Sequence, residues 1–152
     1  MAESGCLRDM QVNNLDVTGT LSTKVPVYSI TGATYTVKAG QSGALFALNK
    51  ADGITITLPA PASGLCFEFV VATAPTTAAT VVTNGSANII HGQIVTSADG
   101  LATTTAASSD TVTFVANTAI IGDRVSLVSD GTSYFVTGFC AAAGGVTTSQ
   151  AS

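Results

Sequence analysis

Residues 52–71, DGITITLPAPASGLCFEFVV, contain the pattern that decides the fold. Apolar and polar side chains alternate in both halves of this stretch, and a period of two is typical of a half-buried strand. Pro59, Pro61 and Gly64 separate the two halves, because proline has no backbone N–H and glycine tolerates a positive φ. The stretch therefore predicts a strand–loop–strand unit at the centre of a β domain. Its expected inward-facing residues are Ile54, Ile56, Leu58, Leu65, Phe67, Phe69 and Val71.

Further short alternating runs lie on both sides of this unit, with turn residues between them. Residues 125–128 and 134–139 flank Asp130-Gly131, which is the clearest hairpin signal in the chain. Residues 44–48 are predicted to join the central unit through a short hairpin loop. No stretch has a convincing helical pattern, and turn signals separate about eight to ten strand candidates. The predicted fold class is all-β: an antiparallel β-sandwich or jelly-roll-like domain with an extended N-terminal arm.

Composition sets the expected domain boundaries. Residues 25–140 contain the alternating runs and form the predicted sandwich domain. Residues 1–24 form the predicted arm, and residues 141–152, which are mostly Ala, Gly, Thr and Ser, form a predicted flexible tail. Two polar stretches inside the domain are interpreted as connections: residues 73–80 as a loop or exposed edge, and residues 98–109 as a loop.

The arm alternates in places, but a short lone strand cannot bury its apolar face without a neighbouring subunit or partner. Arg124 is a candidate contact residue outside the arm, because it follows Asp123 in an otherwise neutral run. Neighbours in a strand face opposite sides, so Arg124 is expected to pair with an acid across strands or to contact another subunit. The predicted contacts with partners or other copies are Met10, Val12, Leu15, Val17, Leu21 and Arg124.

The composition is unusually neutral for a chain of 152 residues. Charged residues make up 9%, against about a quarter in an average soluble domain, while apolar residues make up 46%. The mean hydropathy is +0.48. Such a surface tends to self-associate if it is left in water, which favours a protein covered by its own copies or by a larger partner.

Charge and hydropathy also exclude function classes. The net charge is −4 and the five basic residues are spread singly, which argues against nucleic-acid binding because that needs clustered Lys and Arg. No apolar run approaches a membrane span, and the polar start MAESGCLRDM does not resemble a signal peptide. We therefore expect synthesis in a cytoplasm.

Residues suited to catalysis are sparse. His91 is the only histidine, and before a glycine it is interpreted as a strand-end residue rather than a base. Cys66 and Cys140 lie in apolar runs and are expected to be buried and reduced, whereas Cys6 lies in the polar arm. No phosphate loop, dinucleotide motif or metal-ligand spacing occurs. Aspartates before glycine suit turns, and Tyr28, Tyr35 and Tyr134 are expected in packing. The sequence predicts no enzyme, no cofactor and no metal.

Two motifs carry a resemblance to a recurring domain of tailed-phage virion structural proteins. The first motif is ITLPAPASGLCFEFVV, and the matching residues are Pro59, Pro61, Gly64, Phe67 and Phe69. IIHG and DTVTFVA follow, and then the second motif, IGDRVSLVSDGTSYFVTG. Its matching residues are Gly122, Asp123, Val125, Leu127, Ser129, Asp130, Gly131, Tyr134, Val136 and Gly138. The lead-in NNLDVTGTLS is similar to short strand-forming segments of phage fibre and decoration proteins.

The resemblance implies a non-enzymatic virion structural protein and a homotrimer, and it leaves open a position on the head exterior or in a fibre or tail appendage. For a head decoration protein the expected location is the outer capsid surface and the expected partner is the major capsid protein. A head decoration, or cement, protein is favoured over a fibre, because the chain has neither a long repetitive shaft nor a distinct tip. The alternative is a tail or head fibre, or a receptor-binding module, that contacts host glycans through residues 73–80 and 98–109. That alternative is weakened by the absence of tryptophan.

Overall fold

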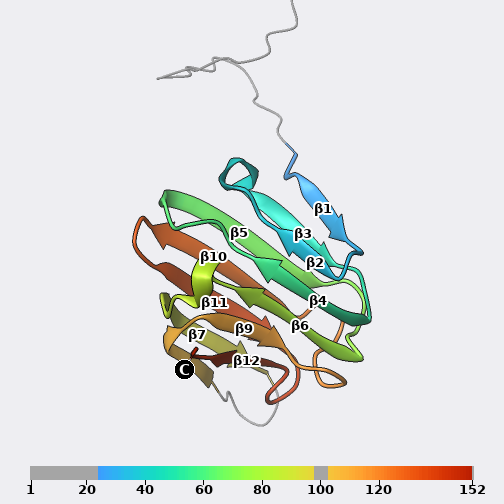
Figure 1. Ribbon diagram of the computed structural model, residues 1–152. Coiled ribbons are helices and arrows are strands. Elements are labelled where there is room, and N and C mark those ends of the chain that lie inside the picture. The colour runs from blue at the N-terminus through green and yellow to red at the C-terminus, as the bar shows by residue number, and fades with distance from the viewer. Residues whose placement is uncertain (1–23, 98–102, 152) are drawn as a thin grey trace, which may run out of the picture.

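The computed structural model describes residues 24–97 and 103–151, which form twelve strands and two short 3-10 turns (Figure 1). The strands lie in two sheets, in the orders β1-β3-β5-β10-β11-β7-β8 and β12-β9-β6-β4-β2. The predicted all-β sandwich is confirmed. The strands are β1 Val27–Ile30, β2 Thr34–Thr36, β3 Ala44–Leu48, β4 Asp52–Thr57, β5 Ser63–Val71, β6 Thr77–Val82, β7 Ile90–Thr96, β8 Thr103–Ser109, β9 Thr111–Phe114, β10 Arg124–Asp130, β11 Tyr134–Cys140 and β12 Val146–Ser149.

The first six strands alternate between the two sheets. Because each crossing reverses the chain, every second strand runs in the same direction, and β1-β3-β5 and β2-β4-β6 are parallel. The predicted antiparallel pairing holds for only five of the ten strand pairings. The expected hairpin between β3 and β4 is wrong for the same reason. The strand–loop–strand unit at residues 52–71 is likewise a crossing between sheets, not a hairpin.

The predicted hairpin at Asp130-Gly131 is confirmed. It joins β10 and β11, which pair antiparallel and lie between β5 and β7 in the seven-stranded sheet. The Asp130 carboxylate accepts the backbone N–H groups of Ser133 and Thr132, both at 2.8 Å, and the Thr132 hydroxyl at 2.9 Å. These hydrogen bonds hold the pKa of Asp130 below its usual value, and the bond from the Ser133 backbone N–H has the largest effect.

Three polar stretches are more regular than expected. β8 lies in the stretch interpreted as a loop, and β6, from the predicted loop or edge, is the central strand of the five-stranded sheet. β12 lies in the predicted flexible tail, where it pairs with β9 and buries Val146 completely. Few residues of these three strands are large and apolar. Backbone pairing with neighbouring strands, rather than their own composition, therefore makes them strands.

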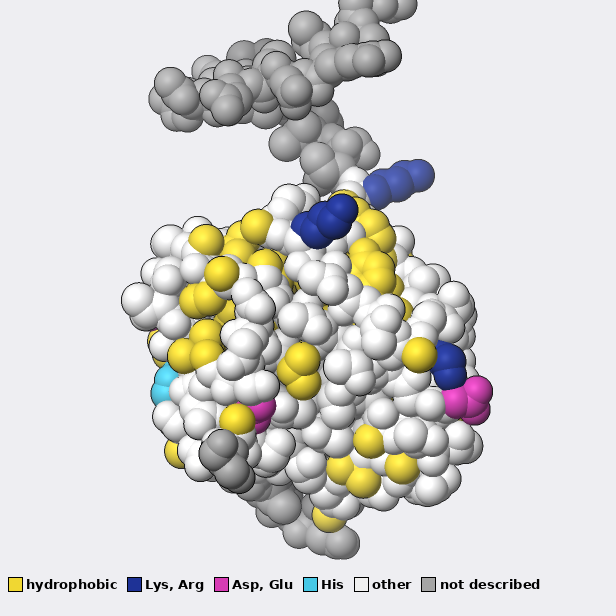
Figure 2. Space-filling view, viewed as in Figure 1, with side chains coloured by type: hydrophobic (Ala, Val, Ile, Leu, Met, Phe, Trp, Pro, Cys, Tyr) yellow, Lys and Arg dark blue, Asp and Glu magenta, His cyan; other side chains and the backbone are white. Residues whose placement is uncertain are grey.

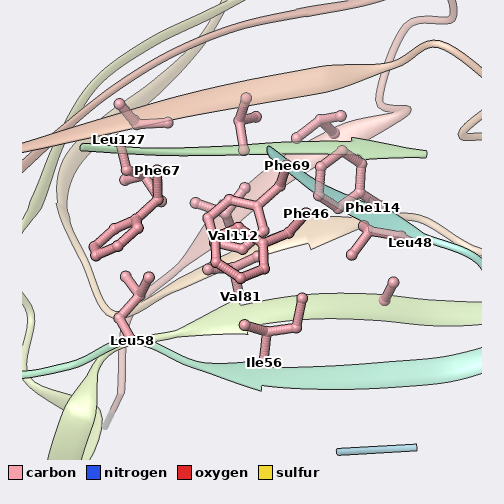
Figure 3. Close-up of a cluster of buried hydrophobic side chains, with 14 of the residues drawn as sticks. Phe46, Leu48, Ile56, Leu58, Phe67, Phe69, Val81, Val112, Phe114 and Leu127 are labelled. Atoms are coloured by element: carbon pink, nitrogen blue, oxygen red, sulfur yellow. The ribbon is translucent and has the colours of Figure 1, made fainter. Parts of the chain in front are cut away.

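The core lies between the two sheets (Figure 3). All seven expected inward-facing residues of the central unit are buried. Phe46 of β3 is fully buried at the centre of an aromatic cluster, stacked on Phe69 with ring centroids 5.2 Å apart. Tyr28 stacks on its other side at 5.3 Å, and Tyr35 lies at 5.9 Å. The packing role expected for the tyrosines is therefore confirmed. No described helix is long and apolar enough to cross a membrane.

Tyr134 provides a test of how β11 is tied to the loop after β4. Its hydroxyl donates to the Pro59 carbonyl at 3.0 Å, and burial raises its pKa above the ordinary value of 10.0. We expect Tyr134→Phe to lower the free energy of unfolding by about 1 kcal/mol at neutral pH. Since the folded-state pKa is raised, the unfolded chain loses this proton first as pH rises, and wild-type stability falls above about pH 10.

Urea unfolding at neutral pH and at about pH 10.5 measures both effects. The Tyr134→Phe variant should lose less stability between the two pH values than the wild type does. An equal loss in both proteins would contradict the assignment of this alkaline effect to Tyr134.

Candidate functional site

The outer face of the five-stranded sheet is a regular array of hydroxyl side chains. In the strand register, threonines lie beside one another across all five strands, and a second row two residues further along is nearly as uniform. Figure 2 shows how few charged side chains lie on the face in view. The first row is Thr34, Thr55, Thr80, Thr113 and Thr147, and the second is Thr36, Thr57, Val82, Thr111 and Ser149. Such a face is suited to contact with water.

The outer face of the seven-stranded sheet is different, because large apolar side chains lie on it. Val128 of β10 and Phe135 of β11 are cross-strand partners, and each is 47% exposed. Phe139 lies further along β11 and is 64% exposed. His91 packs beside Phe135 with ring centroids 6.3 Å apart, and its Nδ1–H donates to the Ala107 carbonyl at 2.6 Å. His91 is thus engaged in packing, but it is the second residue of β7 and the strand continues through Gly92 to Thr96, so the expectation that His91 ends a strand is wrong.

Arg124 pairs with Glu68 across β10 and β5, with 3.5 Å between guanidinium and carboxylate. This confirms the cross-strand alternative for Arg124; the contact with another subunit stays a prediction. Asp123 faces the opposite side and is buried. Its carboxylate accepts the backbone N–H groups of Ile120 at 3.0 Å and Ala141 at 2.9 Å, so it clamps the loop before β10 to the end of β11.

Three shallow hollows form a continuous path across this outer face, which we call the trough. Their volumes are about 170, 180 and 320 Å³. Glu68 and Ser126 line both the first and the second hollow, and Arg124 and Phe139 line both the second and the third. Val25 lies at one end of the trough, and Ile120 and Ile121 lie at the other. The Glu68–Arg124 pair therefore lies in the middle of a mostly apolar path.

The described residues bring no catalytic set together. Groups of three or more His, Cys, Asp or Glu side chains suited to a metal are absent from residues 24–97 and 103–151. Cys140 is buried as expected, but Cys66 is only partly buried because it faces outward from β5. Ser42 accepts the Cys66 amide N–H at 3.0 Å and lies 3.8 Å from its sulfur. The outer face of the seven-stranded sheet can hold a partner chain by packing of its apolar side chains and through the Arg124–Glu68 ion pair.

The five other predicted contact residues, Met10 to Leu21, lie outside the described residues. The stretches proposed for glycan contact are strands over much of their length, since Thr77–Val82 and Thr103–Ser109 belong to the sheets. The trough itself was missed by sequence reasoning. The available signal was that β5, β10 and β11 carry apolar side chains on both faces, which is typical of strands covered on both sides.

The described part of the chain therefore defines a class: a two-sheet β-sandwich with one hydroxyl-rich outer face and one apolar outer face. No protein-family model matches the sequence, and no curated protein matches it.

Proposed function

We propose that this protein is a non-enzymatic virion structural protein, a decoration (cement) protein on the head of a tailed phage. The observation that carries the proposal is the set of large apolar side chains that are exposed, among the described residues, on the outer face of the seven-stranded sheet, in a chain with only 9% charged residues. Contiguous exposed apolar surface marks interaction sites in soluble proteins. A neutral chain with such a face is suited to broad, close-packed contacts within an assembly.

The two motifs of the resemblance support this proposal through the places they occupy. The second motif, residues 121–138, covers most of the β10–β11 hairpin, which presents Phe135 outward, and Phe139 follows directly after the motif. The first motif covers the crossing from β4 to β5 and supplies Glu68, the ion-pair partner of Arg124. The matching residues themselves mostly face the core, since Phe67, Phe69, Val125, Leu127, Tyr134 and Val136 are buried, so they hold in place the strands on which this outer face lies.

In this role the protein acts as a bridge between shell subunits. Each contact with the major capsid protein or with another copy adds favourable free energy to the closed shell, and linked contacts add more than separate ones. Residues 1–24 serve as the arm, by adding a strand to a neighbouring sheet edge. A ring of three copies, each contacting the next through unlike surfaces, closes on itself as a homotrimer. The proposed location is the outer capsid surface.

Deleting residues 1–24 tests the arm. We expect the truncated protein to lose co-sedimentation with empty capsid shells, while its circular dichroism and unfolding midpoint stay close to those of the full chain. The fold should survive because all twelve described strands and the whole described core lie after residue 24. Thr55→Ser, on the hydroxyl-rich face, is the matched control and should bind shells normally.

Two outcomes separate the parts of the proposal. A truncated protein that decorates shells at full occupancy refutes the arm as the bridging element. A full-length, folded protein that ignores shells refutes the decoration function itself.

A further inference from the structure

We propose that, in the free protein, residues 10–21 of the same chain lie in the trough on the outer face of the seven-stranded sheet. The inference concerns the state before assembly. It rests on the proposed function only in taking these residues as the later contact with the shell.

The place where the described chain begins is the first argument. Val25 lines the first hollow of the trough and is 63% exposed, so the preceding residues join the fold at the rim of this path. Residues 10–21 reach up to about 40 Å when extended. Crossing from β5 over β10 to β11 covers two strand spacings, or roughly 10 Å. The segment is therefore long enough to follow the whole trough, and the three residues after it supply the link to Val25.

The apolar content of the two surfaces is the second argument. The segment MQVNNLDVTGTL offers five large apolar side chains: Met10, Val12, Leu15, Val17 and Leu21. The far end of the trough offers Phe139 and Ile121, which are 64% and 66% exposed. Four of the seven large apolar side chains exposed among the described residues, namely Val25, Ile120, Ile121 and Phe139, line the trough. Covering them removes apolar surface of both partners from water.

Charge gives the third argument. Asp16 is the only charged residue in the segment. Arg124 lies in the middle of the trough, at the junction of its second and third hollows, and its side chain is 60% exposed. Nine residue steps separate Asp16 from Val25, up to about 30 Å when extended, so its carboxylate is within reach of the Arg124 guanidinium, which Glu68 already contacts at 3.5 Å. Because the segment is tethered to Val25, its effective concentration at the trough is high.

Docking of this kind gives the free protein a way to shield its apolar face until assembly. A shell or a neighbouring copy that binds residues 10–21 more tightly would release them, and the population would shift to the undocked state. The trough would then be available to the next contact.

Hydrogen exchange on the intact, free protein tests the proposal. We expect backbone amides in residues 10–21 to exchange a few-fold more slowly than in a random coil, since docking through apolar side chains limits their contact with water, although the interior strands β5, β10 and β11 have no free backbone groups to bind them. Phe139→Ser should return them to the random-coil rate. Phe135→Ser, on the same strand but outside the trough, is the matched control and should leave the protection unchanged. Both side chains face outward, so neither change removes a core contact.

A second measurement identifies which copy supplies the segment. The chain has no tryptophan, so Val17→Trp introduces a single reporter. We expect its emission at a short wavelength, independent of protein concentration, with a shift to longer wavelength in the Val17→Trp, Phe139→Ser double variant. A blue shift that appears only together with a rise in molecular mass would overturn the proposal, because it places the segment on a neighbouring copy. Long-wavelength emission from Val17→Trp in the free protein, together with random-coil exchange of residues 10–21, would also overturn it.

The two proposals fail separately. Docking is measured without shells, whereas decoration is measured by co-sedimentation with them. If residues 10–21 do not dock but the protein still binds shells, this inference is refuted and the proposed function stands. If residues 10–21 dock but the protein does not bind shells, the proposed function is refuted and this inference stands.

Discussion

Gly92→Ala is expected to prevent folding to the native state at physiological temperature, with a cost above about 4 kcal/mol. Gly92 lies in β7 with φ +138, at the point where the β7–β8 register shifts, and it pairs with Val136 of β11. A Cβ added there would collide with the Val136 carbonyl oxygen and would lie 2.9 and 3.0 Å from its backbone carbon and nitrogen. Backbone atoms of a central strand cannot move aside without breaking the pairing of β7 with β11.

Gly64→Ala separates this collision from backbone strain. Gly64 also has a positive φ, +82, but an added Cβ would meet nothing within 4 Å. We expect that variant to fold with a loss of about 1–2 kcal/mol, the cost of a left-handed conformation for a residue with a Cβ. Denaturant unfolding, with soluble yield at two temperatures, compares the two. A Gly92→Ala protein that unfolds at the same midpoint as Gly64→Ala would refute the close approach of β7 and β11.

Phe46→Ala is expected to lower the free energy of unfolding by about 3–5 kcal/mol. The Phe46 ring is fully buried and lies among four other aromatic rings, with centroid distances of 5.2 to 6.2 Å. Two of these rings, Tyr28 and Tyr35, come from the edge strands β1 and β2. The loss of their contacts with Phe46 adds to the cavity cost, because among the described residues each of these edge strands pairs with one neighbouring strand only.

Phe135→Ala is the control for Phe46→Ala. The Phe135 ring faces outward and loses only its contacts with Val128 and His91, so this change should lower the unfolding free energy by about 1 kcal/mol, well below the Phe46→Ala cost. Urea unfolding monitored by tyrosine fluorescence and by circular dichroism gives both values. Equal midpoints for the two variants would show that the aromatic cluster does not hold the sheets together.

The buried face of each clearly alternating strand was predictable from the sequence, because a period of two is a local property. The sheet that each strand joins was not predictable in this way. The loop with Pro59 and Pro61 is compatible with a hairpin or with a crossing, and only packing between the sheets decides between them. β8 and β12 were missed because pairing with β7 and with β9, rather than their own composition, makes them strands.

The candidate site was less predictable than the fold. Arg124 was recognised as a charge in a neutral strand, but its partner Glu68 is distant in the chain and becomes a neighbour only through the β5–β10 pairing. The trough has the same origin. Its wall residues come from strands β5, β10 and β11 and from the loop before β10, so no single stretch of sequence contains it.

The position of the β10–β11 hairpin has a consequence for synthesis. In the seven-stranded sheet this hairpin is the sole link between β1-β3-β5 on one side and β7-β8 on the other. During translation β5 and β7 therefore leave the ribosome with open edges: the edge of β5 stays open until β10 has emerged, and the edge of β7 until β11 has emerged. Open edges invite pairing with other nascent chains, and pairings between distant segments form slowly. Messages truncated before this hairpin should consequently yield aggregates rather than partly folded domains, so the last quarter of the chain determines whether the earlier strands fold at all.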